Sequence, residues 1–403
     1  MSTMRQAYVV ASKRTAFGKF GGKLKDFKAA ELGGIASKAA LNTLPKEVEV
    51  DQVIFGNVCH TDNSGAYLAR HVGHYSGLPV KVPALTVNRL CGSGIQSLIS
   101  AAQDIRLGEA DVVLTGGAEN MSMAPYTLHG VRWGTRYGVD QKLEDSLAHA
   151  LVDKVPGHPS SGHKEAPMGI TGENLATKYS ITREQSDAFG LLSQQRWAKA
   201  NAEGAFKAEI SPIELKSKKG TEIFEVDEHP RPQTTSESLA KLPPAFKKDG
   251  LVTAGTASGM GDGAAANVIM SEDALKKYGV KPLARIVSWG LAAVDPNYMG
   301  IGPVEAVRSA LRKGNLSLED MDLIELNEAF ATQWLAVQKE LGFSLEKANV
   351  FGGAIALAHP LGASGARIVA NLTHNLHRLD KKYALGTACI GGGQGIAVIL
   401  ERV

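Results

Sequence analysis

Hydrophobic and polar positions in the first 120 residues follow two alternating patterns. Short apolar runs at 7–12 ("AYVVAS"), 50–58 ("VDQVIFGNV") and 110–117 ("ADVVLTGG") are rich in valine and isoleucine and predict buried strands. Apolar residues recur every three or four positions over 29–44 and again over 95–105, which predicts two helices that each bury one face. This order predicts an α/β fold.

The last 120 residues repeat the same order. The predicted elements are a strand at 283–289, a helix at 304–313, a strand at 320–329, a helix that begins near Gly365 and a strand at 383–392.

Three pairs of matching positions give the distance between the copies. Val9 and Ile286 are 277 residues apart, Asp51 and Asp322 are 271 apart, and Cys91 and Ser364 are 273 apart. A nearly constant offset predicts two copies of one α/β unit. Because strands and helices alternate, we expect a largely parallel sheet covered by helices in each copy.

The segment between the copies has a different character. It is rich in proline, glycine, serine and charge, and it contains one clear helical pattern, from Thr182 to about Glu203. Such an insert is either a surface elaboration or a set of loops that closes a ligand site. We therefore divide the chain into an N-terminal half (1–121), a loop domain (122–249), a strand that returns to the first half (250–273) and a C-terminal half (274–403).

Composition and charge exclude several classes of protein. Of 403 residues, 44% are apolar and 21% charged, and the net charge of +3 is spread without a long block of one sign, so neither a nucleic acid nor a membrane surface is an expected partner. No apolar run reaches the ~18 residues of a transmembrane helix. Because a strand begins by Ala7, we expect no secretory signal or conventional cleavable presequence, and the ending "ILERV" is no peroxisomal signal.

The three cysteines, Cys59, Cys91 and Cys389, lack CxxC or zinc-ligand spacing, so we expect free thiols in a reducing compartment and no metal site. Cys91 precedes a predicted helix. Unpaired N–H groups and the helix dipole would lower its thiol pKa from ~8.5 toward neutrality, which suits a nucleophile. The alternative is a small buried side chain packed at a turn.

Two more reactive side chains stand between glycines in the second copy. His359 precedes Pro360, which disfavours helix at the histidine, and residues 362–365 lead into the next predicted helix. Cys389 ends a strand that three glycines join to another strand, so this is not a dinucleotide motif. A loop histidine and a buried thiol are the structural alternatives. All three reactive groups lie at strand ends or helix starts, where ligand sites form in such sheets.

Five segments, in this order, resemble the signature motifs of the thiolases: "VNRLCGSG", "GGAENMSMAPY", "NEAFA", "GGAIALAHPLGASGAR" and "CIGGGQG". The resemblance implies the thiolase fold, in which two βαβαβαββ halves form five layers with an inserted loop domain. Within the family the chain is most similar to 3-ketoacyl-CoA thiolases of mitochondrial type, which share "DEHPRPQTT", "KLPPAFKKDG" and "MGIGPV".

The resemblance also implies a reaction and the residues that perform it. Cys91 resembles the nucleophile that accepts the acyl group, His359 the group that takes its proton, and Cys389 the acid that protonates the acetyl-CoA carbanion. The N–H groups of Cys91 and Gly391 would hold one oxyanion, and His359 with a water fixed by Asn327 would hold the other. The implied activity is thiolysis of 3-ketoacyl-CoA in fatty acid β-oxidation, and the alternative is a short-chain or biosynthetic acetoacetyl-CoA thiolase.

The matching positions for substrate binding fall mostly outside these motifs. The coenzyme A (CoA) positions are Arg231, Ser238, Ala254, Ser258 and Leu151, and the acyl-pocket positions are Met168, Met299 and Phe330. CoA would be a substrate, and no tightly bound cofactor is expected. The family also implies a homodimer or homotetramer. We expect the mitochondrial matrix in a eukaryote and the cytoplasm otherwise.

Several positions depart from the family pattern. Phe351 and Thr256 replace asparagines and Ala358 replaces a glycine, which would narrow or reshape the site. The loop 157–165 is longer than usual, and Pro167 favours longer acyl chains. Two rival functions are a decarboxylating ketoacyl synthase, which would carry a Cys-His-His set in place of "NEAF" and the second cysteine, and a catalytically silent acyl-CoA-binding protein.

Overall fold

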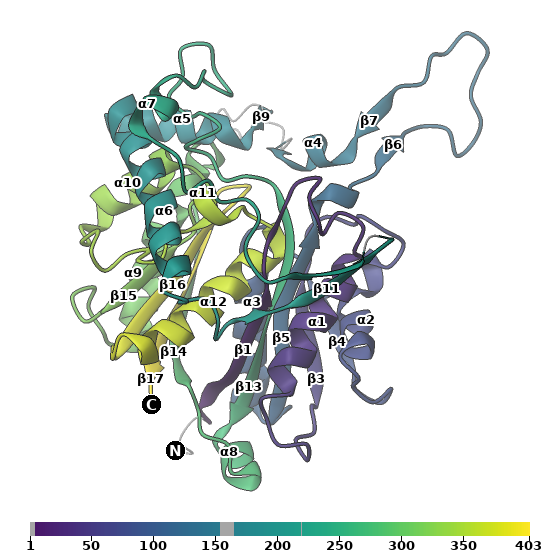
Figure 1. Cartoon of the computed structure of the whole chain (residues 1–403), viewed down its shortest axis with the longest axis vertical. Helices are drawn as coiled ribbons and strands as arrows, with labels where there is room; N and C mark the ends of the chain where they lie inside the picture. Colours follow the sequence, from purple (N-terminus) through teal and green to yellow (C-terminus); the bar gives the residue numbers. More distant parts are fainter. Residues whose placement is uncertain (1–4, 154–164, 219) are drawn as a thin grey trace.

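The computed structural model describes residues 5–153, 165–218 and 220–403 (Figure 1). Eleven of the described strands form one large sheet, and nine of these follow the order β15-β16-β17-β14-β1-β13-β5-β3-β4. Their bounds are β1 (Ala7–Thr15), β3 (Gln52–Gly56), β4 (Ala84–Val87), β5 (Val112–Asn120), β13 (Gly261–Ser271), β14 (Ala284–Ala293), β15 (Leu323–Leu326), β16 (Tyr383–Ile390) and β17 (Gln394–Arg402). The short strands β2 (Gly18–Lys19) and β10 (Ile210–Ser211) pair with β13 and β1.

The sheet consists of two copies of one arrangement. The N-terminal half has the order β4-β3-β5-β13-β1, and the C-terminal half has β15-β16-β17-β14, with a single bridge from Ile324 of β15 to Ala348 in the place of β4. The halves join where β1 and β14 pair through Tyr8 with Arg285 and Val9 with Ala284. The predicted duplication is therefore confirmed.

The expectation of largely parallel sheets is wrong. In each half two strands that are joined through helices pair in parallel, β3 with β5 and β15 with β16, but the last two strands pair antiparallel, β5 with β13 and β16 with β17. The turn between β16 and β17 explains the difference, because a connection of three glycines is far too short for the crossover that a parallel pair requires.

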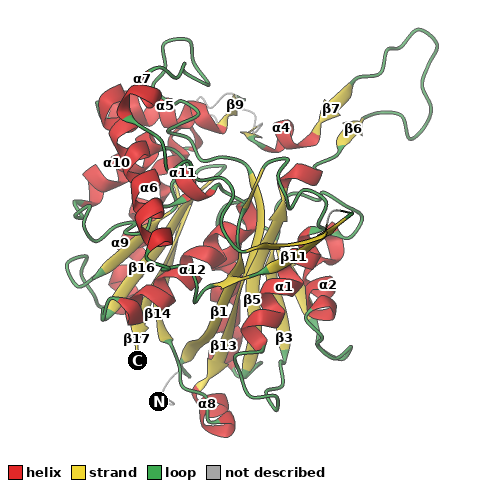
Figure 2. Ribbon diagram, in the orientation of Figure 1, coloured by secondary structure: helices red, strands yellow, loops and turns green. Residues whose placement is uncertain are grey.

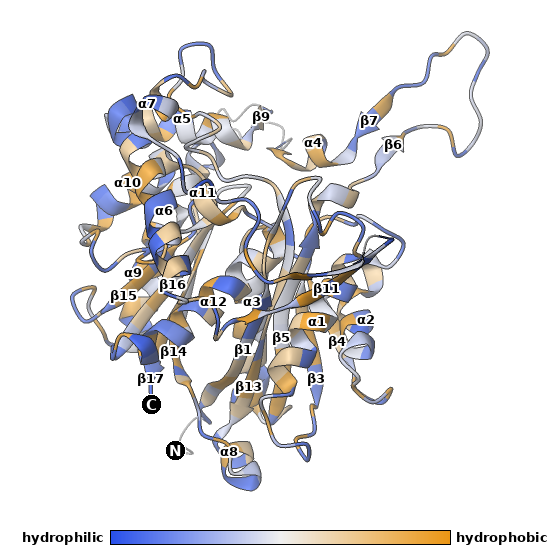
Figure 3. Ribbon diagram, viewed as in Figure 1, coloured by the Kyte–Doolittle hydropathy of each residue, from blue (hydrophilic) through white to orange (hydrophobic). Residues whose placement is uncertain are grey.

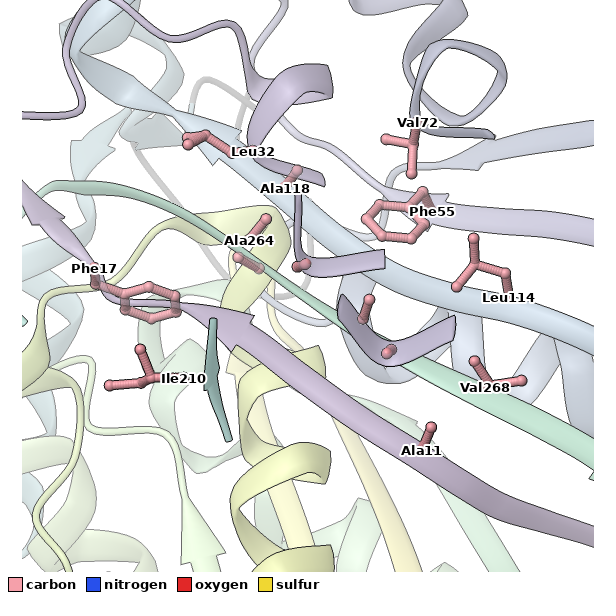
Figure 4. Close-up of a cluster of buried hydrophobic side chains, with 14 of the residues drawn as sticks. Ala11, Phe17, Leu32, Phe55, Val72, Leu114, Ala118, Ile210, Ala264 and Val268 are labelled. Carbon is pink, nitrogen blue, oxygen red and sulfur yellow. The ribbon is translucent and has the colours of Figure 1, made fainter. Parts of the chain in front are cut away.

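Helices cover both faces of each half-sheet and produce five layers (Figure 2). The outer helices are α1 (Ala29–Leu41) and α2 (Leu68–Tyr75) on the first half and α9 (Gly302–Gly314) and α10 (Ala331–Leu341) on the second. Between the halves lie α3 (Ser93–Leu107) and α12 (Leu361–Arg378), which contact each other and both half-sheets. Buried side chains from β1, β3, β5, β13, α1 and α2 fill the outer core of the first half (Figure 4).

Two aspartates demonstrate how closely the halves correspond. Asp51 Oδ2 accepts hydrogen bonds from the N–H groups of Asp111 and Val112, both at 2.8 Å. In the second half Asp322 Oδ2 accepts from the N–H groups of residues 382 and 383, at 2.9 and 3.0 Å. Each donor and each acceptor in the first half is 271 residues away from its counterpart in the second half. This is the offset of the two central helices as well.

The two central helices touch at glycines with the same offset. A Cβ atom on Gly94 of α3 would lie 2.2 Å from the backbone nitrogen of Ala366 in α12, and a Cβ on Gly365 would lie 2.6 Å from the backbone nitrogen of Ile95. Gly94 and Gly365 are therefore equivalent, and the residue that matches Cys91 is Gly362 rather than Ser364. The start predicted near Gly365 is also wrong, because α12 begins at Leu361, and residues 362–365 form its first turns.

The middle of the chain packs over one end of this framework. Its helices are α4 (Ser146–Ala150), α5 (Met168–Lys178), α6 (Arg183–Ala202) and α7 (Ser236–Ala240), and its strands are β6 (Tyr126–Leu128), β7 (Leu143–Asp145), β8 (Val152–Asp153), β9 (Ala166–Pro167), β11 (Ile213–Ser217) and β12 (Gly220–Phe224). The predicted helix from Thr182 is confirmed, with Thr182 as its N-cap. The division of the chain at residues 121, 249 and 273 stays a prediction.

Two further features complete the fold. The buried Arg14 of β1 pairs with Glu209 and Asp227, which anchors the middle segment to the first half. The hairpin of β6 and β7 projects away from the body, and hydrophobic segments alternate with hydrophilic ones along it (Figures 1 and 3). Two short α-helices remain among the described residues, α8 (Glu272–Tyr278) and α11 (Ala354–Leu357), together with three 3₁₀ helices at Gly65–Tyr67, Met121–Met123 and Pro296–Ile301. Among the helices that the structure describes, none is long and apolar enough to cross a membrane.

The junction of α11 and α12 contains a strained backbone. Ala358 has φ 78° and ψ 172°, a region that is almost restricted to glycine. Its methyl group faces Gly261 of β13, where an added Cβ would lie 2.8 Å from the Cβ of Ala358. Hydrogen bonds on both sides hold this conformation, from Ala358 N to Ala354 O and from His359 N to Gly259 O.

We expect Gly94→Ala to lower the free energy of unfolding by about 3 kcal/mol, because the methyl group would overlap the backbone of α12. The matched control is Gly73→Ala in α2, where the new Cβ would meet its nearest neighbour at an ordinary 3.4 Å. That variant should be neutral or slightly stabilising. Urea unfolding of both variants measures the difference, and an unaffected Gly94→Ala would contradict the backbone contact.

We expect Ala358→Gly to raise the free energy of unfolding by about 1 kcal/mol, because relief of backbone strain exceeds the extra entropy that glycine gives to the unfolded chain. Ala356→Gly, two residues earlier in helical geometry, should instead be destabilising. Thermal unfolding of the two variants gives the comparison. Destabilisation of both by similar amounts would refute the strain at Ala358.

Candidate active site

Cys91 lies in the turn that leads into α3. Leu90 has a positive φ of 46°, Gly92 caps the helix, and α3 begins at Ser93. The Cys91 side chain is half-buried and packs in an apolar cluster that includes Cys59, Leu151 and Leu361. The predicted position before a helix N-terminus is therefore confirmed.

The expectation that Cys91 has a lowered pKa is wrong. Burial raises the pKa of this thiol to about 11, although hydrogen bonds from the N–H groups of Gly391 and of Cys91 itself act in the opposite direction. The helix start is present, but the protein atoms around the sulfur remove so much of its hydration that desolvation outweighs the dipole. Both N–H groups that we predicted to hold an oxyanion thus lie at the Cys91 sulfur.

His359 is buried, and its hydrogen bonds define which nitrogen carries the proton. Its Nδ1 lies 2.6 Å from the Ser364 hydroxyl, which in turn donates to the Pro360 carbonyl at 3.0 Å. Because the hydroxyl proton is used there, we assign the ring proton to Nδ1, which donates to Ser364. The Nε2 atom then accepts from the Asn327 side-chain amide at 3.4 Å. Burial lowers the pKa of His359 to about 4, so the ring is neutral and Nε2 is a base.

Cys389 is the penultimate residue of β16, is fully buried and belongs to an apolar cluster with the three predicted acyl-pocket residues. These are Met168, Met299 and Phe330. Burial raises the pKa of the Cys389 thiol far above its ordinary value, and the neighbouring Cys91 raises it further. The cysteines of the two halves therefore lie within electrostatic reach of each other.

Close packing joins these groups into one site. A Cβ on Gly391 would lie 3.2 Å from a methyl group of Leu90 and 3.4 Å from the sulfur of Met168, so the turn after Cys389 lies against the residue before Cys91. Residues 257–259 make the connection to His359. Ala257 packs in the Cys389 cluster, Ser258 N donates to Ala329 O, and Gly259 O accepts from His359 N.

Beside this centre lies a cavity of about 260 Å³ that contains three of the five predicted CoA positions. Arg231, Ser238 and Ala254 line it, together with Gln194 and His229, which the sequence analysis did not find. The other two positions lie elsewhere. Ser258 follows the strand-like segment beside Ala329, and Leu151 packs in the cluster around Cys91. The longer loop lies mostly outside the described residues.

The departures from the family pattern occupy distinct places. Thr256 is buried, and its hydroxyl accepts a hydrogen bond from Thr253 N at 2.9 Å. Phe351 packs edge-on against Phe206, with ring centroids 6.3 Å apart. Pro167 stands directly before α5, whose first residue is Met168. Across the described part of the chain, no group of three His, Cys, Asp or Glu side chains is arranged to hold a metal ion.

Comparisons with known proteins agree with this geometry. Residues 7–273 match the model of the thiolase N-terminal domain, and residues 280–402 match that of the thiolase C-terminal domain. Mitochondrial 3-ketoacyl-CoA thiolase of Homo sapiens is 56% identical over 402 residues, which cover 100% of this chain and 99% of that protein. An acetyl-CoA acetyltransferase of Pseudomonas aeruginosa is 49% identical over 405 residues, covering 99% and 100%.

A solved structure gives the same result in three dimensions. The crystal structure of the human mitochondrial 3-ketoacyl-CoA thiolase in complex with CoA superposes with a TM-score of 0.94 at 55% identity, and the match covers 99% of this chain and 98% of that one. With two family models that together span almost the whole chain, a shared fold and two thiols gathered with a neutral imidazole, this chain belongs to the thiolase family.

Proposed function

We propose that this protein cleaves 3-ketoacyl-CoA with CoA, giving acetyl-CoA and an acyl-CoA shortened by two carbons, as in fatty acid β-oxidation. The observation that carries the proposal is the gathering of Cys91, Cys389 and the neutral Nε2 of His359 beside one apolar cluster of side chains. The name of the human relative, a 3-ketoacyl-CoA thiolase, supports the substrate class.

The first half-reaction begins with proton transfer from the Cys91 thiol to His359 Nε2. Because Cys91 and His359 are both neutral before transfer, the thiolate and imidazolium form as a pair inside the protein and stabilise each other. The Cys91 sulfur then attacks the keto carbon of the substrate. The keto oxygen of the substrate gains negative charge. The N–H groups of Cys91 and Gly391 would stabilise this charge by about 3 kcal/mol each.

Cleavage of the C2–C3 bond leaves the acyl group on Cys91 and an enolate of acetyl-CoA. The Cys389 thiol donates its proton to C2, while His359 and a water held by Asn327 stabilise the enolate oxygen. The Cys389 thiol suits this role because its raised pKa keeps it protonated until a carbanion is present. After acetyl-CoA leaves, the His359 imidazolium gives its proton to the Cys389 thiolate, so both groups are neutral again. The thiol of a second CoA then gives its proton to His359 and attacks the acyl-enzyme, and Cys91 leaves as a thiolate that takes this proton back.

The cavity beside the site would hold the CoA. Arg231 is exposed at its rim and carries a positive charge for the nucleotide phosphates, and Ser238 and Ala254 line the path inward. The positions of Ser258 near Ala329 and of Leu151 near Cys91 suit contacts with the pantetheine arm close to the thiol.

The substrate range within the family is a finer proposal. A short-chain acetoacetyl-CoA thiolase is the alternative, and it has support from the acetyl-CoA acetyltransferase of Pseudomonas aeruginosa. Identity to that protein is 49%, against 56% to the human 3-ketoacyl-CoA thiolase. We therefore propose a preference for longer chains, and, from the name of the human relative, a mitochondrial location if the source is a eukaryote.

We also propose a homo-oligomer. Two surfaces support it: the edge strand β4, whose outer side has no partner strand among the described residues, and the projecting hairpin, on which Trp133 and Tyr137 are exposed. Unpaired strand edges and clusters of exposed apolar side chains are typical of protein contact sites.

Thiolysis is tested by the CoA-dependent loss of the magnesium enolate absorbance of 3-ketoacyl-CoA substrates of increasing chain length. We expect activity that rises with chain length and that Cys91→Ala lowers by at least about 10⁴-fold, because the acyl group has no other acceptor. Cys59→Ala, in the same cluster, is the matched control and should keep most of the activity. No thiolysis at any length would leave a silent acyl-CoA-binding protein as the better interpretation.

Light scattering tests the oligomer. We expect a mass of two or four chains for the unmodified protein, and a smaller assembly for the double variant Trp133→Ser and Tyr137→Ser, because these changes remove the exposed apolar side chains of the hairpin. The matched control is the double variant Leu107→Ser and Leu379→Ser, which changes two exposed apolar residues outside the hairpin. It should keep the mass of the unmodified protein. A monomeric wild type would contradict the proposal.

A further inference from the structure

A buried carboxylate that the mechanism does not use lies beside Cys91. Glu119, near the end of β5, is fully buried, and its oxygens accept four hydrogen bonds. Oε1 accepts from the side-chain amide of Asn57 and from Cys59 N, both at 3.0 Å, and Oε2 accepts from Val58 N at 3.1 Å and Gly362 N at 2.8 Å. No basic side chain that the structure describes donates a hydrogen bond to it.

The bond to Gly362 crosses from the first half to the second. Gly362 is the second residue of α12, and its N–H is one of those that a helix start leaves without an internal partner. His359 stands three residues before Gly362, and Ser364 stands two residues after it. The Ser364 hydroxyl accepts a hydrogen bond from His359 Nδ1. Glu119 therefore fixes the helix turn that orients the imidazole.

The same carboxylate bears on Cys91. It holds the backbone of Cys59, which packs with Cys91 and Leu361 in one cluster, and Leu361 directly precedes Gly362. Ionised Glu119 raises the pKa of both the Cys91 and the Cys59 thiols. Burial raises the pKa of Glu119 to about 7, with a further contribution from Asp262 of β13, so Glu119 is mainly ionised at pH 8.

We propose that Glu119 is a positioning residue with two opposite effects: it holds the start of α12, and with it His359, in place for catalysis, and its negative charge opposes a thiolate at Cys91 in the free protein. The first effect rests on the proposed function, but the second does not. A carboxylate in this place therefore makes the resting nucleophile less reactive while it makes the assembled site more effective.

Glu119→Gln separates the two effects. The amide has the same shape as the carboxylate but no charge. Its NH₂ group must face N–H groups that donate hydrogen bonds to the carboxylate in the wild type, so some of these bonds are lost. We expect the thiol pKa of Cys91 to fall by about half a unit, which gives about threefold faster alkylation by iodoacetamide at pH 8. In the same variant we expect thiolysis to slow, with kcat about tenfold lower and KM little changed, because His359 loses its alignment.

Glu119→Asp is the complementary variant, because it keeps the charge but is one methylene shorter and cannot reach both Gly362 and the 57–59 loop. It should lose kcat yet alkylate as slowly as the wild type. The matched control is Glu173→Gln. Glu173 is another buried carboxylate that accepts backbone hydrogen bonds, from Leu251 and Val252, but it is not among the groups that shift the pKa of Cys91. Its alkylation profile from pH 7 to 11 should match the wild type.

Alkylation is followed by mass spectrometry of the Cys91 peptide, and thermal unfolding of each variant shows that it is folded at the assay temperature. Unchanged or slower alkylation of Cys91 in Glu119→Gln would overturn the charge effect. Unchanged kcat in both Glu119 variants would overturn the positioning effect. Because alkylation needs no substrate, a wild type without thiolysis would overturn the proposed function and the positioning effect together, and the alkylation result would still decide the charge effect.

Discussion

The contact between Gly94 of α3 and Gly365 of α12 is the constraint on which the site depends. Since neither residue has a side chain, the two helices approach at backbone distance near their N-termini. Cys91 stands three residues before the first glycine, and Ser364, which orients His359, stands directly before the second. Any larger residue at this crossing would separate the two halves of the protein at the place where their reactive groups must meet.

Burial is the second organising influence. It shifts every reactive group toward its uncharged form. The pKa of Cys91 rises to about 11 and that of His359 falls to about 4, so both are uncharged before a reaction begins. A low-dielectric site penalises a single charge more strongly than a close pair of opposite charges. The protein therefore favours a proton transfer between the two groups over a permanent thiolate.

Much of this could be predicted from the sequence. Apolar periodicity and the repeated order of elements were sufficient for the two α/β halves, and the motif resemblance led to the family. Local patterns were not sufficient where tertiary contacts decide. Glycines at 362 and 365 argue against a helix, yet α12 runs through both because close packing requires their small size: Gly365 lies against the backbone of α3, and Gly362 lies against the backbone of Gly56 and Ala118 in β3 and β5. The pKa of Cys91 and the environment of Glu119 depend on residues that are distant in the sequence, and no local signal points to them. Ser364 lies only five residues after His359, but its role depends on the helical turn that brings the two side chains together.

The equivalence of the two halves has a consequence for the kind of molecule that the site can accept. Positions 91 and 362 correspond, and one carries a thiol where the other has only hydrogen; likewise Cys389 corresponds to Ala118 and Ile390 to Glu119. Two identical halves around a twofold axis would present the same groups to both ends of a bound molecule and could not tell a donor carbon from an acceptor carbon. Divergence within one covalently joined chain breaks this symmetry, so a single cleft can treat the two sides of one carbon–carbon bond differently.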